Sequence, residues 1–397
     1  MTAKLRMFTA GESHGKALVG ILEGFPANVP VRKDEIDRQL ARRQRGYGRG
    51  GRMQIEQDEA QVLAGIRFGK TLGSPLALVI WNRDWPNWQE KMDPWEQHPN
   101  IEPLTAPRPG HADYPGWFKY RHRDLRNVLE RASARETAAR VALGAICRQL
   151  LQQFGVGVAS HVIEIGGVRA SHLPAELSDP RRCTPPVLNE LNLRADQSPV
   201  RCLDPEAEER MKAAIDRARE EEDTLGGQFE VIAAGMPPGL GSHVHWERRL
   251  DARIAHAFMS IPAVKAVEIG LGTELAHVPG SQAHDEILLE AGRIVRATNR
   301  AGGLEGGMTN GLPIVVRATM KPLPTLMRPL RTVDLLRREE RVAFTERGDV
   351  CAVPAASIVG EAMLAFVLAD AFCEAFGNDS LEQMRINYEA YCVQMGL

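Results

Sequence analysis

The sequence has few cysteines, and they are not arranged in pairs. Six occur among 397 residues, with no C-x-x-C motif and no zinc-finger spacing. A chain of this length does not need disulfide bonds to hold a fold together. The distribution excludes a disulfide-rich secreted scaffold and predicts a protein of the reducing cytoplasm.

Long apolar runs are missing as well. No window approaches about 18 uninterrupted apolar residues. The N-terminal segment contains no long apolar stretch followed by a cleavage site. We therefore expect neither a membrane span nor export.

The chain also lacks an excess of one charge. Its formal net charge is -2, its pI is near 6.6, and aromatic residues make up 6% of it. Nucleic-acid binding usually requires a basic surface and aromatic side chains for base stacking. We therefore expect no nucleic-acid partner, and an RNA- or phosphate-binding module is a minor alternative.

Linker-like segments are equally scarce. The composition, 44% hydrophobic and 25% charged, is that of a soluble globular protein, without low-complexity tracts or repeats. We therefore expect one large domain over residues 1–397. Residues 81–105, which are polar and contain tryptophan and proline, are expected to form a surface insertion.

Several common catalytic motifs do not occur. The sequence has no Walker loop, no strand-linked G-x-G-x-x-G, no G-x-S-x-G and no H-E-x-x-H. These absences argue against an NTPase, a Rossmann dehydrogenase and a zinc site, so we expect no metal.

What the sequence does contain is a dense cluster of arginines. Six lie in a glycine-rich stretch with no acidic residue before Glu56: Arg38, Arg42, Arg43, Arg45, Arg49 and Arg52. Arginines at this density repel one another unless a phosphate, a carboxylate or open solvent surrounds them. Glycines such as Gly46 and Gly50 let backbone N–H groups approach an anion. We interpret the segment as an anion site; the alternative is a solvated basic loop.

Periodicity and turn residues predict a mixture of strands and helices. Strands are expected over residues 17–22, 228–234, 263–269 and 314–319, and helices over residues 34–43, 205–222, 250–258 and 355–376. Residues 133–136 (SARE) form a capping-box pattern, which predicts a helix that begins after Ser133 and extends to Phe154. The positive end of that helix, beside Arg131 and Arg135, suits a phosphate.

Two histidines are candidate proton donors. His14 lies in residues 11–15 (GESHG) and His111 in residues 108–113 (RPGHAD), where turn residues are expected to expose each ring instead of burying it. Histidine titrates near pH 6.5 and can serve as a general acid. The alternative is a turn histidine that only hydrogen-bonds the backbone.

Two further segments permit either a functional or a structural interpretation. Arg347 and Asp349 lie on a turn, where a surface salt bridge is the alternative to a site. Glycine pairs at residues 302–303 and 306–307 would allow close approach of a flat or phosphorylated ligand, although such pairs also occur in plain turns.

Seven segments, in this order, closely resemble the chorismate synthase family over nearly the whole chain. They are residues 11–15 (GESHG), 43–53 (RQRGYGRGGRM), 108–113 (RPGHAD), 131–137 (RASARET), 226–229 (GGQF), 321–322 (KP) and 347–349 (RGD). The resemblance implies an α+β fold, a layered sandwich of β-sheets and α-helices, assembled as a homotetramer. It also implies a phosphate lyase that converts 5-enolpyruvylshikimate 3-phosphate to chorismate and phosphate by anti-1,4-elimination. This reaction is the last step of the shikimate pathway and requires reduced FMN without net redox change.

Matching the family's motif positions to this sequence implies roles for individual residues. The implied catalytic residues are His14, His111 and Asp349, and the implied substrate ligands are Arg43, Arg49, Arg52, Arg108 and Arg135. The implied flavin-binding residues are Arg131, Ala132, Ser133, Ala263, Gly306, Lys321, Pro322, Leu323, Pro324, Thr325 and Arg347.

The resemblance also suggests a mechanism. We hypothesise that reduced flavin donates electron density as the allylic C3–O bond breaks and recovers it as hydrogen leaves C6. His14 would protonate the departing phosphate and His111 would stabilise or protonate the reduced flavin. Asp349 would assist flavin N5 as the base that finally accepts the C6 proton.

Two features bear on how this member differs within the family. Pro262 stands where many members carry an amide residue, which questions a side-chain contact with flavin there. Some members reduce their own flavin with NADPH, but nothing here resembles a reductase module, so we expect an external flavin reductase or reductant. An FMN-dependent oxidoreductase with net hydride transfer is the competing interpretation.

Overall fold

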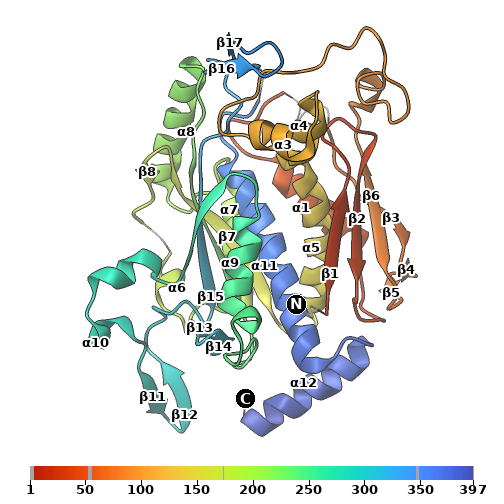
Figure 1. Cartoon of the computed structure of the whole chain (residues 1–397). Coiled ribbons are helices and arrows are strands. Elements are labelled where there is room, and N and C mark those ends of the chain that lie inside the picture. The colour runs from red at the N-terminus through yellow and green to blue at the C-terminus, as the bar shows by residue number, and fades with distance from the viewer. Residues whose placement is uncertain (1–3, 52–55, 173, 346–347, 397) are drawn as a thin grey trace.

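Two antiparallel sheets enclose a layer of helices (Figure 1). The computed structural model describes residues 4–51, 56–172, 174–345 and 348–396. Within these residues, helices and strands form the layered α+β sandwich that the family resemblance implies. That prediction of fold class is confirmed.

The first sheet has four strands in the order β1 (Arg6–Ala10), β2 (Ala17–Glu23), β6 (Leu76–Trp81) and β3 (Gln61–Ala64). Burial alternates along β2, where Leu18 and Leu22 are fully buried and Ile21 is exposed. At Gly20 an added Cβ would lie 3.0 Å from Leu143, so the neighbouring helix packs directly on the strand. One face of the sheet therefore covers the helical layer.

The second sheet has five strands in the order β10 (Val264–Ile269), β15 (Ile314–Met320), β9 (Gly227–Ala234), β7 (Gly157–Ile165) and β8 (Val168–Arg169). Nearly every residue of β7 is buried. The reason is that α11 (Val353–Phe376) packs on one face of this sheet and α7 (Pro185–Gln197) on the other.

Three helices form the central layer: α1 (Lys33–Gln44), α5 (Thr137–Gln152) and α11. α11 is long and apolar enough to cross a membrane, but 94% of its most apolar stretch is buried within the fold. An added Cβ at Gly144 of α5 would lie 2.5 Å from the Cβ of Ala362, so the two helices cross in close contact. α11 is therefore the centre of the hydrophobic core.

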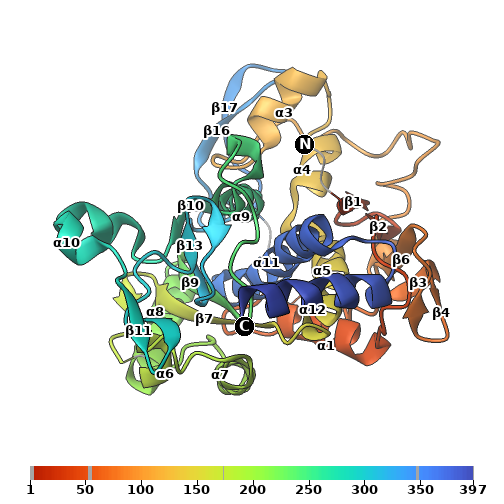
Figure 2. The ribbon, with the colours of Figure 1, turned by 90° about the horizontal axis from the view of Figure 1, so that it is seen from below.

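The remaining elements surround these layers. α9 (Leu250–Met259) packs on α11 and β10, and α12 (Leu381–Met395) crosses beneath the layer (Figure 2). The other helices are α3 (Asp113–Tyr120), α4 (Arg126–Ala132), α6 (Ala175–Ser178), α8 (Pro205–Glu220) and α10 (Gly280–Ala283), with 3-10 turns η1 (Trp85–Asn87), η2 (Ala134–Glu136), η3 (Trp246–Arg248) and η4 (Gly272–His277). Short hairpins pair β4 (Ile66–Arg67) with β5 (Lys70–Thr71), β11 (Ile287–Glu290) with β12 (Arg293–Arg296), β13 (Leu304–Glu305) with β14 (Met308–Thr309), and β16 (Arg331–Asp334) with β17 (Glu339–Val342).

The predicted helix start at Ser133 needs a correction. α4 ends at Ala132, and the Ser133 hydroxyl accepts a hydrogen bond from the N–H of Arg135 at 3.3 Å, at the start of the 3-10 turn η2. α5 begins only at Thr137, because the chain must first turn from one helix into the next. Glu136, the expected partner in the capping box, pairs instead with Arg140.

Candidate active site

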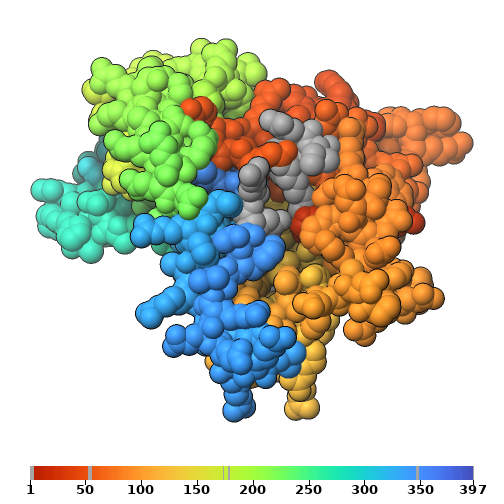
Figure 3. Space-filling view, turned by 90° about the horizontal axis from the view of Figure 1, so that it is seen from above, coloured from red at the N-terminus to blue at the C-terminus, as the bar shows by residue number. Residues whose placement is uncertain are grey.

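A cavity of about 390 Å³ lies at the N-terminal ends of α5 and α11. Loops that follow β1, α1 and β15 line it, together with residues that precede β10. In the view from above, segments from the N-terminal part of the chain (orange) lie on the right and segments from the C-terminal part (blue) lie on the lower left (Figure 3). The volume falls in the range of small-molecule sites. Two helix N-termini give the cavity a positive field that favours an anionic ligand.

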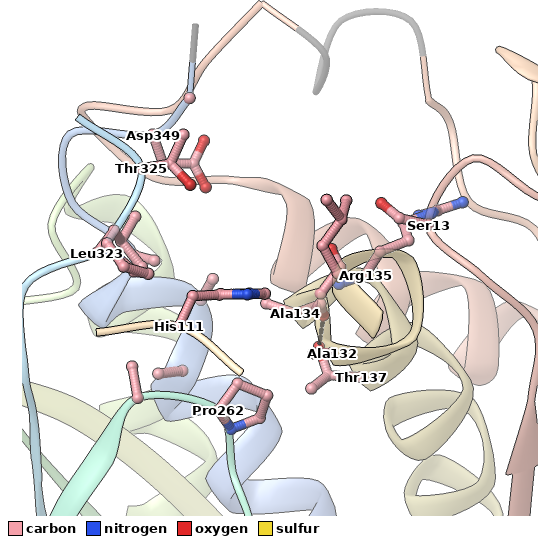
Figure 4. Close-up of a pocket in the computed structure, with 18 of the residues that line it drawn as sticks. Ser13, His111, Ala132, Ala134, Arg135, Thr137, Pro262, Leu323, Thr325 and Asp349 are labelled. Atoms are coloured by element: carbon pink, nitrogen blue, oxygen red, sulfur yellow. Dashed lines mark hydrogen bonds between the residues drawn. The ribbon is translucent and has the colours of Figure 1, made fainter. Parts of the chain in front are cut away.

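Most of the residues singled out in the sequence line this cavity. They are His14, Arg43, Arg49, Arg108, His111, Ala132, Ser133, Arg135, Ala263, Lys321, Leu323, Pro324, Thr325 and Asp349. In Figure 4, His111, Leu323, Thr325 and Asp349 lie on one side, and Ser13, Arg135 and Thr137 on the other. The predicted segments therefore converge in space.

His14 follows β1 and is buried, with only 6% of its surface exposed. The prediction that its turn would expose the ring is wrong. Its Nδ1 lies 2.9 Å from Oε1 of Glu130, and its ring stacks on Trp88 with a centroid separation of 3.8 Å. Nε2 makes no hydrogen bond within the part of the chain that the structure describes. Nε2 is therefore the ring atom available to a ligand in the cavity.

His111 belongs to a compact group with Arg108 and Asp113. Its Nδ1 contacts a carboxylate oxygen of Asp113 and lies 3.1 Å from Nη2 of Arg108. Arg108 also donates to the hydroxyl of Thr325 at 3.0 Å. Burial raises the pKa of the Asp113 carboxyl, but hydrogen bonds from His111 and Arg108 outweigh it and bring the pKa to about 2. The ionised carboxylate fixes both neighbours at the cavity wall.

Arg43 is buried at the cavity. Its Nε donates to the hydroxyl of Thr137 at 2.9 Å and its Nη2 to the carbonyl of Ala134 at 2.8 Å. Nη1 is buried without a hydrogen-bond partner among the described residues, since the nearest carboxylate oxygen, on Asp58, is 3.7 Å away. Burial, together with nearby Arg135 and Arg49, lowers the pKa of Arg43 to about 10. Its charge therefore lacks full compensation from the protein.

Arg135, although it lines the cavity, has its guanidinium held by the protein. Nη1 donates to both oxygens of Asp58, at 2.6 and 2.7 Å, and Nη2 donates to the side-chain oxygen of Asn82 at 2.9 Å and to Glu56 at 3.5 Å. The same Asp58 is thus shared between Arg135 and Arg43.

Arg49 and Asp349 form an ion pair of 3.0 Å at the cavity. The other oxygen of Asp349 accepts the N–H of Gly50 at 2.7 Å. An added Cβ at Gly50 would lie 3.0 Å from the carbonyl of Gly348, so glycine permits this close approach. The glycines were expected to let N–H groups reach an anion, and the anion that Gly50 meets is a carboxylate of the chain itself.

One wall of the cavity is apolar. It includes Ile261, Met320 and Val359, which are all nearly fully buried. The N–H of Lys321 donates to the carbonyl of Ala263 at 2.9 Å, which joins the loop before β10 to the turn after β15. Such a surface beside cationic groups suits a ligand with a flat apolar ring and anionic substituents.

Three of the predicted residues do not line the cavity: Arg131, Gly306 and Pro322. The guanidinium of Arg131 donates to two backbone carbonyls, that of Thr9 in β1 and that of Gly11 just after the strand. Pro322 is one residue beside lining residues. Arg52 and Arg347 lie outside the described residues.

Gly306 lies on the β13–β14 hairpin, near the start of α9, where the N–H of Leu250 donates to the carbonyl of Gly307. The cavity residues follow the other end of this ten-residue helix. A helix of this length separates the two places by roughly 15 Å. Gly306 is therefore set apart from the residues that line this cavity, and a ligand contact there stays a prediction.

Sequence reasoning missed the apolar wall of the site and also the residues that hold its charged and aromatic groups, which include Glu130, Asp58 and Trp88. Glu130 directly precedes the motif at residues 131–137, and this position beside a site segment was the signal that could have found it. Asp58 and Trp88 carry no local signal, because only the folded chain brings them to Arg135 and His14.

The chain is similar to known proteins over nearly its whole length. The chorismate synthase family model matches residues 5–373. A chorismate synthase of Aquifex aeolicus is 56% identical over 390 residues, which cover 98% of this chain and 97% of that protein. One of Geobacter sulfurreducens is 54% identical over 396 residues, 98% of each chain. A crystal structure of a chorismate synthase superimposes with a TM-score of 0.78 at 46% identity, covering 98% of both chains.

Proposed function

The chain belongs to the chorismate synthase family, and from this premise we propose that its cavity binds the substrate phosphate at Arg43, beside reduced FMN. The enzyme is a phosphate lyase that forms chorismate from 5-enolpyruvylshikimate 3-phosphate at the last step of the shikimate pathway. The proposal concerns which residues of this chain carry the reaction and which cofactor they hold.

The incompletely compensated charge of Arg43 is the observation that carries the proposal. A buried guanidinium nitrogen without a hydrogen bond costs free energy until an anion reaches it. The substrate carries a phosphate and two carboxylates, and phosphate binds arginine strongly. Helix N-termini of α5 and α11 add to the attraction.

The donor set also fits FMN. The apolar wall at Ile261, Met320 and Val359 offers a surface for a flat ring, and Lys321 and the N-terminus of α11 lie beside it. Ala263 and Pro262 border the same wall, so a backbone contact remains available where the family usually has an amide. When bound, reduced FMN supplies electron density as the C3–O bond breaks and takes it back as the C6 hydrogen leaves.

The chain's own residues then handle protons. His14 donates the Nε2 proton to the departing phosphate, which makes the phosphate a better leaving group. His111, held by Asp113 and Arg108, provides a proton at the flavin side of the cavity. Asp349, held by Arg49 and Gly50, accepts the proton that leaves C6.

We also propose a cytoplasmic homotetramer whose flavin is reduced by an external reductase or reductant. Gly306 supports the assembly, because it does not line the cavity of its own chain and a neighbouring subunit could offer it a flavin. Pro322 and Arg131 would act through the backbone around the flavin.

An anaerobic assay tests the proposal. Purified protein receives 5-enolpyruvylshikimate 3-phosphate and a catalytic amount of chemically reduced FMN, while chorismate, phosphate and consumed reductant are measured. We expect equal amounts of both products without stoichiometric oxidation. Product formation without flavin, or one reductant consumed per turnover, would contradict the cofactor role; unchanged activity of Arg43→Met would contradict the phosphate site.

A further inference from the structure

We propose that Glu130 and Trp88 are positioning residues that clamp the imidazole of His14 and direct Nε2 alone toward the substrate phosphate. The inference rests on the proposed role of His14 as proton donor. It also gives residues 81–105 a function, since Trp88 comes from that segment.

Glu130 binds His14 at both its ring and its backbone. Its two carboxylate oxygens lie 2.9 and 3.0 Å from Nδ1, and Oε2 also accepts the backbone N–H of His14 at 2.8 Å. The carbonyl of Glu130 accepts the N–H of Ser13 at 2.9 Å. Glu130 is 2% exposed, so water does not compete for these contacts. The end of α4 and the turn after β1 are therefore joined at this histidine.

The carboxylate also determines which ring nitrogen holds a proton. An ionised carboxylate only accepts hydrogen bonds, so Nδ1 must carry a proton in both the neutral and the charged ring. Nε2 is then the nitrogen that gains and loses the proton. This is the logic by which a buried acid orients a catalytic histidine.

Trp88 fixes the plane of the ring. The two rings are 3.8 Å apart and inclined by 15°, which is a stacked arrangement. The indole is itself held, because its Nε1–H donates to Asp84 at 3.0 Å and the backbone N–H of Trp88 donates to the carbonyl of Trp85 at 2.9 Å. One face of the imidazole is thereby shielded from solvent, and rotation about its side-chain bonds is blocked.

His14 can pass one proton to the departing phosphate while its contacts with Glu130 stay in place. As the C3–O bond breaks, its electron pair goes to the phosphate oxygen, and the imidazolium passes its Nε2 proton to the phosphate. The ring is left neutral with its Nδ1–H still on Glu130. No movement of the histidine is needed between its two states.

Glu130→Gln is the most informative variant, because an amide can donate to Nδ1 and allow the other tautomer. We expect kcat to fall about 10²–10⁴-fold, the range that a positioned general acid contributes, with KM changed less than about 3-fold. The ¹⁵N chemical shifts of His14 in labelled protein report the tautomer directly, and we expect a new population protonated at Nε2.

Two substitutions of Trp88 test whether an aromatic ring is needed at this position. Trp88→Ala should lower kcat and Trp88→Phe should restore most of it, since phenylalanine can still stack. Trp95→Ala is the matched control, because Trp95 is in the same segment and 91% exposed. A kcat for Trp88→Ala equal to that of the control would overturn the role of Trp88.

The outcomes separate this inference from the proposed function. If His14→Ala retains near-native turnover, the proton-donor role is wrong and the positioning role falls with it. If His14→Ala is inactive while Glu130→Gln keeps its kcat and its ¹⁵N pattern, the positioning role alone is wrong. A flavin affinity near that of the unaltered protein shows that each variant folds.

Discussion

Arg42 and Arg43 are neighbours on α1, yet their surroundings are opposite. Every guanidinium nitrogen of Arg42 is bonded, to Asp196 at 2.8 Å, to both oxygens of Glu361 at 2.8 and 2.9 Å, and to two amide oxygens. Burial disfavours its charge, but Glu361 and Asp196 outweigh this and raise the pKa of Arg42. Arg43, equally buried, has a lowered pKa and a nitrogen without a partner among the described residues.

The difference teaches how to distinguish a structural from a functional arginine. Arg42 joins Arg148 and Arg201 around the buried Glu361, where the fold supplies the opposite charge. Arg43 faces a cavity and shares Asp58 with Arg135, so the remainder of its opposite charge must come from outside. Density of arginine in the sequence could not separate the two, because both lie in the same glycine-rich stretch.

The largest expected effect is on the structural side of this comparison. Glu361→Gln leaves three buried arginines without their shared carboxylate, so we expect the free energy of unfolding to fall by about 3–5 kcal/mol. Urea unfolding at one protein concentration measures it. Glu374→Gln on the same helix is the control, because its pairs are at the surface and are worth about 0–1 kcal/mol. Equal effects of the two variants would refute the distinction.

The next effect is on the functional side. Arg43→Met should reduce kcat/KM about 10²–10³-fold, because a desolvated charge contact to the phosphate is lost. Stability should not fall, since an incompletely compensated buried charge is removed with it. Steady-state kinetics and urea unfolding together measure the two effects. Arg45→Met, at an exposed position nearby, is the control and should leave both unchanged.

Arg108 is an intermediate case, a cavity arginine with its own carboxylate. The pKa of Asp113 is lowered to about 2 in the folded protein, whereas it is near 4 in the unfolded chain. The ionised carboxylate therefore adds to the free energy of unfolding above pH 4, and this addition is lost as the pH falls toward 2. At neutral pH the free energy of unfolding of the unaltered protein should therefore exceed that of Asp113→Asn by about 2 kcal/mol. The free energies of unfolding of the two proteins, measured by urea unfolding, should become equal between pH 4 and pH 2. A difference that persists at pH 2 would show that the stabilisation does not come from the ionised carboxylate of Asp113.

The smallest effect uses inorganic phosphate as a probe. At ten times its Kd, phosphate should stabilise the folded protein by about 1.4 kcal/mol, or about 2 °C in Tm. Thermal unfolding should show this shift in unaltered protein and lose it in Arg43→Met. Sodium chloride at matched ionic strength is the control, and an equal shift with chloride would exclude a specific phosphate site.

The sequence predicted the layers better than the buried contacts. Residues 314–319 and 34–43 were expected as strand and helix from periodicity, and they form β15 and α1. The spacing of apolar residues in such a segment follows the local geometry of a strand or helix, so the segment alone is enough to predict it. Ser133 shows the limit: the capping pattern was correct locally, but α4 ends directly before it and turns the helix start into η2.

Within the site, sequence motifs predicted the loops that converge but not what each side chain contacts. His14 was expected to be exposed because its neighbours are turn residues, whereas Glu130 and Trp88, distant in sequence, bury it. Arg131 was expected at the flavin, yet its guanidinium binds β1. Partners of this kind depend on tertiary packing, which no local pattern encodes.

The central position of α11 has a consequence for synthesis on the ribosome. The N–H of Leu5 donates to Asp370 of α11 at 2.8 Å, so the first strand region is bonded to a residue made 365 positions later. At roughly 5–20 residues per second, β7, which ends at Ile165, waits about 10–40 s for α11, which begins at Val353 and covers one face of the second sheet. During this interval the nascent chain exposes apolar sheet faces, and chaperones that bind such surfaces become part of how this enzyme reaches its native state.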